Sequence, residues 1–307
     1  MKIIQLSWLN DQAVKDPKGL VEACEDAYAR KIDLAADQIK ERASTHPVVV
    51  LSGPSGSGKT TSARRIEHRL EEMGVNSHTI SMDDYFLSRD EYPVPKDEEG
   101  NDDLESPLCV DWELLNRHIA LLAQGREVAV PQFNFTTQRR DDVARPLRLA
   151  RDEIVVMEGI HALNPLLLDQ VGRYATGVYV SMRTRIERPD HELIGPEHLR
   201  VVRRIVRDAG TRNRTADQTI EAWKSVRRGE MLYIMPHKEN ADISIDTFIP
   251  YEPCVTTHLA APLLTAMPEE AKTMGEGEII CSLPSLFATL PVTMVPDHSL
   301  LNEFLGK

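Results

Sequence analysis

Residues 47–60 read Pro-Val-Val-Val-Leu-Ser-Gly-Pro-Ser-Gly-Ser-Gly-Lys-Thr, and this stretch decides the fold. Residues 47–52 are apolar and β-branched, which is typical of a strand buried on both faces of a parallel sheet. Residues 53–60 match G-x-x-x-x-G-K-[ST], the loop whose backbone N–H groups surround the phosphates of nucleoside triphosphates. The spacing of apolar residues then predicts a helix over 60–73 that stops at Gly74.

Strand, glycine loop and helix therefore occur in the order that phosphate binding needs. The glycines let successive N–H groups point inward, and the helix N-terminus adds partial positive charge. Lys59 is expected to reach the β and γ phosphates, and Thr60 to bind Mg²⁺ through its hydroxyl. The alternative is a flexible Gly/Ser turn. The predicted nucleotide-binding residues of this loop are Gly53, Ser55, Gly56, Ser57, Gly58, Lys59, Thr60 and Thr61.

Composition narrows the class of protein. A chain of 307 residues can bury one large α/β core, or a core plus a small appended region. A net charge of −12 argues against a general binder of nucleic acid or of membrane surfaces. Four scattered cysteines without C-x-x-C spacing fit reduced thiols in a cytoplasmic protein. The N-terminus has no apolar signal core, and no apolar run is long enough for a membrane span.

The chain divides by pattern into three parts, at 1–45, 46–248 and 249–307. The first is predicted to be a helical arm, over 19–42, for packing or homo-oligomerisation. In the second, short apolar runs alternate with helical periodicities, as a doubly wound parallel sheet requires. The third is predicted to be a helical extension packed on the second, and its sequence assigns it no chemistry.

Within the middle part we expect further strands at 78–82, 154–157, 177–181 and 243–245, and helices at 111–124, 197–209 and 216–234. A hairpin-like insertion is predicted from 127–135 and 147–149. The polar segment 89–106 is expected to be a mobile loop whose acidic residues are solvated.

Two carboxylates follow the second strand. The carboxyl ends of strands in an open α/β sheet face the ligand, so Asp83 and Asp84 are expected beside the phosphate loop. A carboxylate there can accept a proton from an attacking hydroxyl or hold Mg²⁺ through water. Asp83 is the stronger candidate because it comes first after the strand. The alternative is an aspartate that caps a helix.

The strand at 154–157 is followed by Glu158 and Gly159. An acid at this place can complete the Mg²⁺ shell opposite Thr60. The alternative is an ordinary turn at the end of a strand.

A third candidate is an arginine-rich helix. The spacing i, i+3, i+4, i+7 puts four arginines on one stripe, and phosphoryl transfer uses such a clamp on the transferring group. The alternative is a solvated helix face tied to Asp208 and Glu197. The arginines are Arg200, Arg203, Arg204 and Arg207 on the stripe, with Arg212 and Arg214 beyond it.

Phe133 and Phe135 alternate as they would on a strand. Two aromatic faces can hold a planar base between them, but such a pair serves equally well in a core.

These motifs together resemble the uridine kinase and phosphoribulokinase family of P-loop kinases. The resemblance runs from about residue 47 to 246 and includes the phosphate loop and the segments 81–86, 111–115, 130–137, 157–160 and 203–208, in the family's order. It implies an α/β P-loop fold in which helices flank a parallel sheet, with a β-hairpin insertion and an arginine-rich helical lid.

The resemblance also implies roles for single residues. Asp83 would be the base that accepts the proton of the acceptor hydroxyl, and it would also contact the metal. Lys59, Thr60 and Glu158 would bind the phosphates and Mg²⁺. Arg207, Arg212 and Arg214 would be lid arginines over the phosphates. Glu105 and Arg204 would hold the ribose hydroxyls, with Phe133, Phe135 and Gln138 near the base. Phe133 and Gln138 stand where the family has a tyrosine and a histidine, a departure from pyrimidine recognition.

The segments 158–165, 223–230 and 299–306 look closer to a bacterial branch in which a region similar to threonyl-tRNA synthetase precedes the kinase domain. This chain has no room for that region, so functions that depend on it are not expected here.

The sequence therefore predicts ATP- and Mg²⁺-dependent phosphorylation of the 5′-hydroxyl of a nucleoside. One alternative is transfer to another sugar or vitamin hydroxyl. Another is a nucleotide-binding regulator without transfer activity. A GTPase is disfavoured because no N-K-x-D motif occurs.

Overall fold

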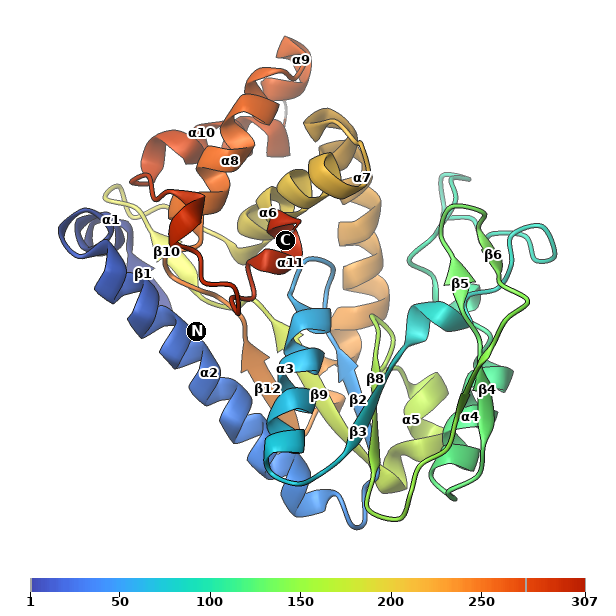
Figure 1. Ribbon diagram of the computed structural model, residues 1–307. Helices are drawn as coiled ribbons and strands as arrows, with labels where there is room; N and C mark the ends of the chain where they lie inside the picture. Colours follow the sequence, from blue (N-terminus) through green and yellow to red (C-terminus); the bar gives the residue numbers. More distant parts are fainter. Residues whose placement is uncertain (1, 274, 307) are drawn as a thin grey trace.

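A five-stranded parallel sheet forms the centre of the molecule in the computed structural model, which describes residues 2–273 and 275–306 (Figure 1). The strand order is β12-β9-β2-β8-β3. The strands are β2 (Val48–Ser52), β3 (Ser77–Ser81), β8 (Ile154–Glu158), β9 (Ala175–Ser181) and β12 (Ile243–Asp246). The order reverses at β2, and ligands bind at such a switch point in doubly wound sheets. The predicted α/β class is confirmed, with each strand within two residues of its expected bounds.

Alternation along β2 explains why helices cover both faces of the sheet. Val49 and Leu51 point into one core, while Val48 and Val50 point into the other. Helices α2 (Pro17–Arg42) and α3 (Lys59–Glu72) pack on the first face, and α4 (Trp112–Leu122) and α5 (Pro165–Val171) on the second (Figure 1). Apolar residues are therefore required at each of positions 48–51 of β2.

The N-terminal part packs along the sheet. Helix α2 lies against α3 and β12 and contains the helix predicted over 19–42. Sequence patterns did not indicate α1 (Leu6–Lys15) or the small sheet of β1 (Ile3–Gln5), β10 (Arg185–Glu187) and β11 (Leu193–Ile194). These strands are too short to show a periodicity. In the described residues no helix is both long and apolar enough to cross a membrane.

The insertion between β3 and β8 contains two short antiparallel ribbons. One pairs β4 (Val128–Val130) with β7 (Arg145–Leu147), and the other pairs β5 (Phe133–Asn134) with β6 (Arg139–Arg140). The preceding segment 89–106 was predicted to be solvated, which is wrong for Asp103, whose exposed fraction is 2%. Its carboxylate accepts a hydrogen bond from the Tyr233 hydroxyl at 2.8 Å and pairs with Arg228 at 3.0 Å.

The lid region consists of α6 (Pro196–Thr211) and α7 (Ala216–Gly229). The helix predicted over 216–234 continues past Gly229 as a π-helical turn, η4 (Glu230–Ile234), and then as η5 (Met235–Asn240). The remaining 3₁₀ turns are η1 (Met82–Tyr85), η2 (Pro107–Cys109), η3 (Gly172–Tyr174) and η6 (Val292–Met294).

The C-terminal helices pack on this lid region (Figure 1). They are α8 (Pro253–Thr265), α9 (Glu269–Lys272), α10 (Glu276–Leu286) and α11 (Asn302–Leu305). Both α8 and α11 contact α6. The division of the chain at 45 and 248 stays a prediction.

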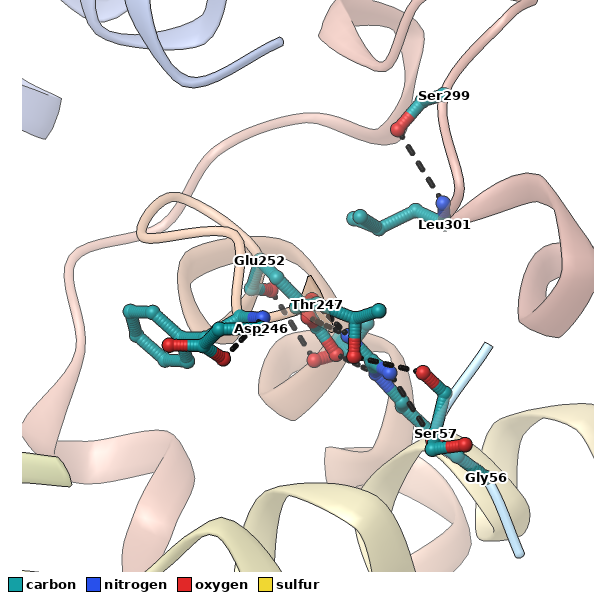
Figure 2. A network of polar contacts seen from close by, with 10 residues as sticks. Gly56, Ser57, Asp246, Thr247, Glu252, Ser299 and Leu301 are labelled. Atoms are coloured by element: carbon teal, nitrogen blue, oxygen red, sulfur yellow. Dashed lines mark hydrogen bonds and ion pairs between the residues drawn. The ribbon is translucent and has the colours of Figure 1, made fainter. Parts of the chain in front are cut away.

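A buried ion pair joins α6, the C-terminal segment and the phosphate loop. The Arg203 guanidinium donates to both Glu252 carboxylate oxygens, at 2.5 and 2.6 Å, and both side chains are almost fully buried. Arg203 also donates to the Gly56 carbonyl at 3.0 Å, and the Thr247 hydroxyl donates to the Ser57 carbonyl at 2.7 Å. Figure 2 shows Gly56, Ser57, Thr247 and Glu252 gathered at this junction.

We expect Glu252→Gln to destabilise the protein by about 3–5 kcal/mol, because it leaves the Arg203 charge buried without a counter-ion. Urea denaturation followed by circular dichroism measures the change. The control is Glu221→Gln, which removes an exposed partner of Lys224 and should cost about 0–1 kcal/mol. Equal effects of the two substitutions would contradict the assignment of Arg203–Glu252 as a buried anchor.

Candidate active site

The loop after β2 has the backbone of a phosphate-binding loop. Gly56 and Gly58 have φ values of +71° and +84°, a region that favours glycine. A Cβ on Gly53 would lie 1.9 Å from the Val180 carbonyl oxygen, so this position admits no side chain. The N–H groups of Gly58, Lys59 and Thr60 donate to no described residue. They stand at the N-terminus of α3, where anions are favoured.

Lys59 lies among three carboxylates. Its ammonium donates to the Pro54 carbonyl at 3.2 Å. Its positive charge also lowers the pKa values of Asp83, Glu105 and Glu158, against the larger effect of burial, which raises them. The structure thus brings together four predicted site residues from four different parts of the chain.

Asp83 lies in η1, directly after β3. Ser81 caps this turn, because its hydroxyl accepts from the Asp83 N–H at 3.4 Å, so the capping alternative for Asp83 does not apply. The Asp83 carboxylate has no hydrogen bond or ion pair with a described residue, and burial raises its pKa. Asp84 differs, because its carboxylate accepts from the Phe133 N–H at 3.2 Å. Of the pair, Asp83 is the one whose carboxylate has no hydrogen bond with a described residue.

Glu158 ends β8 beside the loop. It is buried, accepts from the Ser81 hydroxyl at 3.2 Å, and has its pKa raised by burial. Thr60 and Glu158 offer the oxygen donors that Mg²⁺ prefers. Among described residues no group of three or more His, Cys, Asp or Glu side chains could hold a metal ion. The donors present fit a cation held largely by phosphate and water, which is usual for Mg²⁺ at nucleotide sites.

Thr61, predicted to bind nucleotide, has a partner from the C-terminal end of the chain. The Glu303 carboxylate of α11 accepts from the Thr61 N–H at 3.1 Å and from its hydroxyl at 2.7 Å. Leu300 packs against Gly58, where an added Cβ would come 2.6 Å from the Leu300 Cδ1. An acidic side chain therefore already stands at the first turn of α3. Sequence reasoning gave residues 299–306 no chemical role.

The arginine stripe of α6 is not a solvated face, because Arg200, Arg203 and Arg204 are buried. Its role as a phosphate clamp stays a prediction. Arg200 is buried and donates to both Glu230 carboxylate oxygens, at 2.9 and 2.8 Å, and to the Ser55 carbonyl at 3.0 Å. Arg203 is engaged with Glu252 and Gly56 as described above. Both residues support the phosphate loop through its carbonyl oxygens, and their charges are already neutralised.

The remaining lid arginines gather near Asp208. The Arg207 guanidinium donates to the Asp208 carboxylate at 3.0 and 2.8 Å, and Arg212 lies 3.5 Å from the same oxygen. The charge of Arg212 also acts on Asp83 and lowers its pKa. Arg214 is exposed. Arg212 and Arg214 are thus the arginines best placed to reorient toward a bound phosphate.

Glu105 and Arg204, predicted to hold the ribose hydroxyls, lie close enough to influence each other. Burial raises the pKa of Glu105 to about 7, and the Arg204 charge opposes this shift. Burial lowers the pKa of Arg204 to about 10, while the guanidinium donates to the Ser55 hydroxyl and stacks on Trp223. A Cβ on Gly229 would come 2.2 Å from the Glu105 Cβ, so α7 holds Glu105 in place.

The predicted base-reading residues do not form a sandwich. The Phe133 and Phe135 rings are 5.2 Å apart but meet edge to face at 73°, and Phe86 packs on both. Phe133 is buried, while Phe135 is exposed. The Gln138 amide donates to the Phe135 carbonyl, and its φ of +59° belongs to the turn between β5 and β6. All three side chains are engaged in the ribbon itself.

The fold and this site define a P-loop α/β protein with a free carboxylate beside its phosphate loop. The model of the "Phosphoribulokinase / Uridine kinase family" matches residues 48–187. The uridine kinase of Deinococcus deserti is 30% identical over 200 residues, which span 64% of this chain and 86% of that protein. The uridine kinase of Oceanobacillus iheyensis is 31% identical over 203 residues, 65% of this chain and 86% of that protein.

A solved structure described as a possible uridine kinase from Bacillus stearothermophilus aligns with a TM-score of 0.47 at 18% identity, covering 71% of this chain and 98% of that one. The chain belongs to the phosphoribulokinase and uridine kinase family, a family of kinases.

Glu105 should make stability depend on pH. Its ordinary pKa of 4.5 rises to about 7 in the folded protein, so the folded state holds this proton more tightly. The resulting stabilisation is complete below about pH 4.5 and is lost as the pH rises through 7. Urea denaturation should show that Glu105→Gln flattens this decline between pH 5 and pH 8. The exposed control Glu127→Gln should keep the wild-type slope, and an unchanged slope in Glu105→Gln would contradict the assignment.

Proposed function

We propose that the protein is a kinase that transfers the γ-phosphoryl group of ATP, with Mg²⁺, to the 5′-hydroxyl of a nucleoside. The observation that carries the proposal is the position of Asp83. Its unpaired carboxylate follows β3 at the switch-point edge of the sheet and lies within reach of the Lys59 charge. Phosphoryl transfer to a hydroxyl needs a base and a phosphate-binding lysine, and both lie at this edge of the sheet.

In the proposed reaction the acceptor oxygen bonds to the γ-phosphorus while the bond from phosphorus to the β–γ bridging oxygen breaks. The proton of the acceptor hydroxyl passes to the Asp83 carboxylate, and ADP leaves. Lys59 and the free N–H groups of the loop would stabilise the phosphate oxygens. Mg²⁺, when bound, would neutralise charge on the phosphates, with Thr60 and Glu158 as its protein contacts.

The proposal for the lid is that Arg207, Arg212 and Arg214 approach the phosphates once nucleotide is bound. Arg212 supports this idea because it is half exposed and already acts electrostatically on Asp83. We also propose that the protein is cytoplasmic, because its cysteines fit reduced thiols. We propose further that it forms a homo-oligomer in which the N-terminal arm takes part.

A second candidate is a kinase for another sugar or vitamin hydroxyl. The observation that favours it is the state of the β5–β6 ribbon, where Phe133 and Gln138 are occupied by contacts within the insertion. Asp83 would play the same part in either reaction.

Asp83→Asn should lower kcat by at least about a hundredfold, because an amide cannot accept the proton, while ATP affinity stays within about twofold. Steady-state kinetics and direct ATP binding measure the two effects. Asp84→Asn is the matched control and should lose far less, because Asp84 serves the Phe133 backbone. Full turnover in Asp83→Asn would refute the proposed base.

Glu303→Gln should lower the KM for ATP by about two- to fivefold, because it removes a negative charge from the helix terminus that phosphate approaches. The amide oxygen can still accept from the Thr61 hydroxyl, so the local structure should persist. Glu278→Gln, an exposed change in α10, is the control. A KM that is unchanged or raised would argue against competition between Glu303 and nucleotide.

A further inference from the structure

His161 is a buried histidine near the reacting groups to which the proposed reaction assigns no part. It follows Glu158 by three residues, and its exposed fraction is 1%. A Cβ on Gly159 would lie 2.4 Å from the Met82 Cβ, so this segment approaches the turn that carries Asp83 without a side chain between them. His161 thus belongs to the carboxyl edge of the sheet.

Two aromatic rings fix the position of the imidazole. The Trp112 ring centroid is 6.4 Å away, and the Tyr233 centroid is 6.3 Å away in an edge-on arrangement. Tyr233 is held by its hydrogen bond to Asp103, which in turn pairs with Arg228. The two rings around His161 therefore come from two separate segments of the chain, α4 and η4.

The ring nitrogens of His161 are only poorly satisfied by the described part of the chain, where the Glu105 backbone is their nearest partner. Neither has a well-formed hydrogen bond with a described residue. Burial lowers the pKa of His161 to about 4, although the Glu105 backbone and the Asp103 charge favour the protonated ring. The ring is therefore neutral near pH 7, with one nitrogen able to donate and one able to accept. A buried polar group without a partner is costly, so a ligand or water is expected there.

The surroundings indicate which ligand fits. The Lys59 charge acts on both His161 and Glu105, which ties the imidazole to the Asp83 end of the site. The carboxylate of Asp83, which pairs with no cation among the described residues, disfavours an anionic acceptor such as a sugar phosphate. A neutral imidazole suits a hydroxyl or amide group of an uncharged molecule.

We propose that His161 binds a polar group of an uncharged, hydroxylated acceptor, in a subsite formed with Glu105, Trp112 and Tyr233 rather than in the β5–β6 ribbon. This proposal rests on the proposed kinase function and adds a specificity-determining residue to it. The acceptor hydroxyl points toward Asp83, and the more distant part of the acceptor meets His161.

The test compares His161→Phe and His161→Asn with wild type, using uridine, cytidine, adenosine and D-ribose as acceptors. For whichever of these wild type phosphorylates, His161→Phe should raise the acceptor KM by about tenfold or more, while the KM for ATP stays within about twofold. His161→Asn, which keeps a donor and an acceptor, should lose less. His118→Gln is the control, because His118 is a buried histidine whose partner is the Tyr85 hydroxyl.

Direct binding gives a second readout that does not need turnover. In protein labelled with ¹³C at histidine Cε1, the acceptor that wild type phosphorylates should shift the His161 signal when it is added without ATP. ATP alone should not shift this signal. If both His161 variants match His118→Gln in acceptor KM and the signal does not move, His161 does not contact the acceptor, and the kinase assignment stands. If wild type phosphorylates none of the four compounds and none of them shifts the His161 signal, both the nucleoside kinase proposal and the subsite proposal are overturned.

Discussion

The bidentate pair between Arg203 and Glu252 is the constraint on which the rest of the site depends. Both charged groups are buried away from water, so removing either one would leave the other unpaired and would lower the stability of the fold strongly. Because Arg203 also donates to the Gly56 carbonyl, the pair fixes the distance between α6 and the phosphate loop. The first turns of the helix therefore act as an anchor. Arg212 and Arg214, just beyond the C-terminal end of α6, are exposed instead.

Buried carboxylates around Lys59 dominate the electrostatics of the site. Lys59 lies among Asp83, Glu105 and Glu158, whose pKa values are all raised by burial. Two of these carboxylates also feel the negative charge of Asp83. A polyphosphate added to this cluster would increase the negative charge further, and a divalent cation would offset part of that charge. The acidic character of the site thus provides a physical reason for the proposed Mg²⁺ dependence.

Sequence patterns predicted the elements that depend on local order. The apolar runs located all five strands of the parallel sheet, and the glycine loop placed Gly56 and Gly58 where positive φ is needed. Sequence patterns could not predict which side chains pair when they are far apart along the chain. Arg200 and Arg203 are satisfied by Glu230 and Glu252, and the helical spacing that put both arginines on one stripe carries no information about those partners. Asp103 was expected in solvent because its neighbours are charged, yet Tyr233 and Arg228 bury it.

The same limit applies to the candidate site. Thr61 meets Glu303 at the far end of the chain. His161 lies in the segment 158–165, where the sequence pattern indicated a family resemblance but no chemistry for this side chain. The positions of Asp83 and Glu158 were predictable because Asp83 comes just after β3 and Glu158 ends β8. The roles of the predicted site residues stay predictions.

Incubation with γ-³²P-labelled ATP, Mg²⁺ and a panel of nucleosides and other small alcohols tests the central claim most directly. The proposal predicts that label appears on the 5′-position of a nucleoside. Label on another sugar or vitamin hydroxyl would favour the second candidate. ATP that binds tightly but transfers label to no acceptor would contradict the proposed kinase activity.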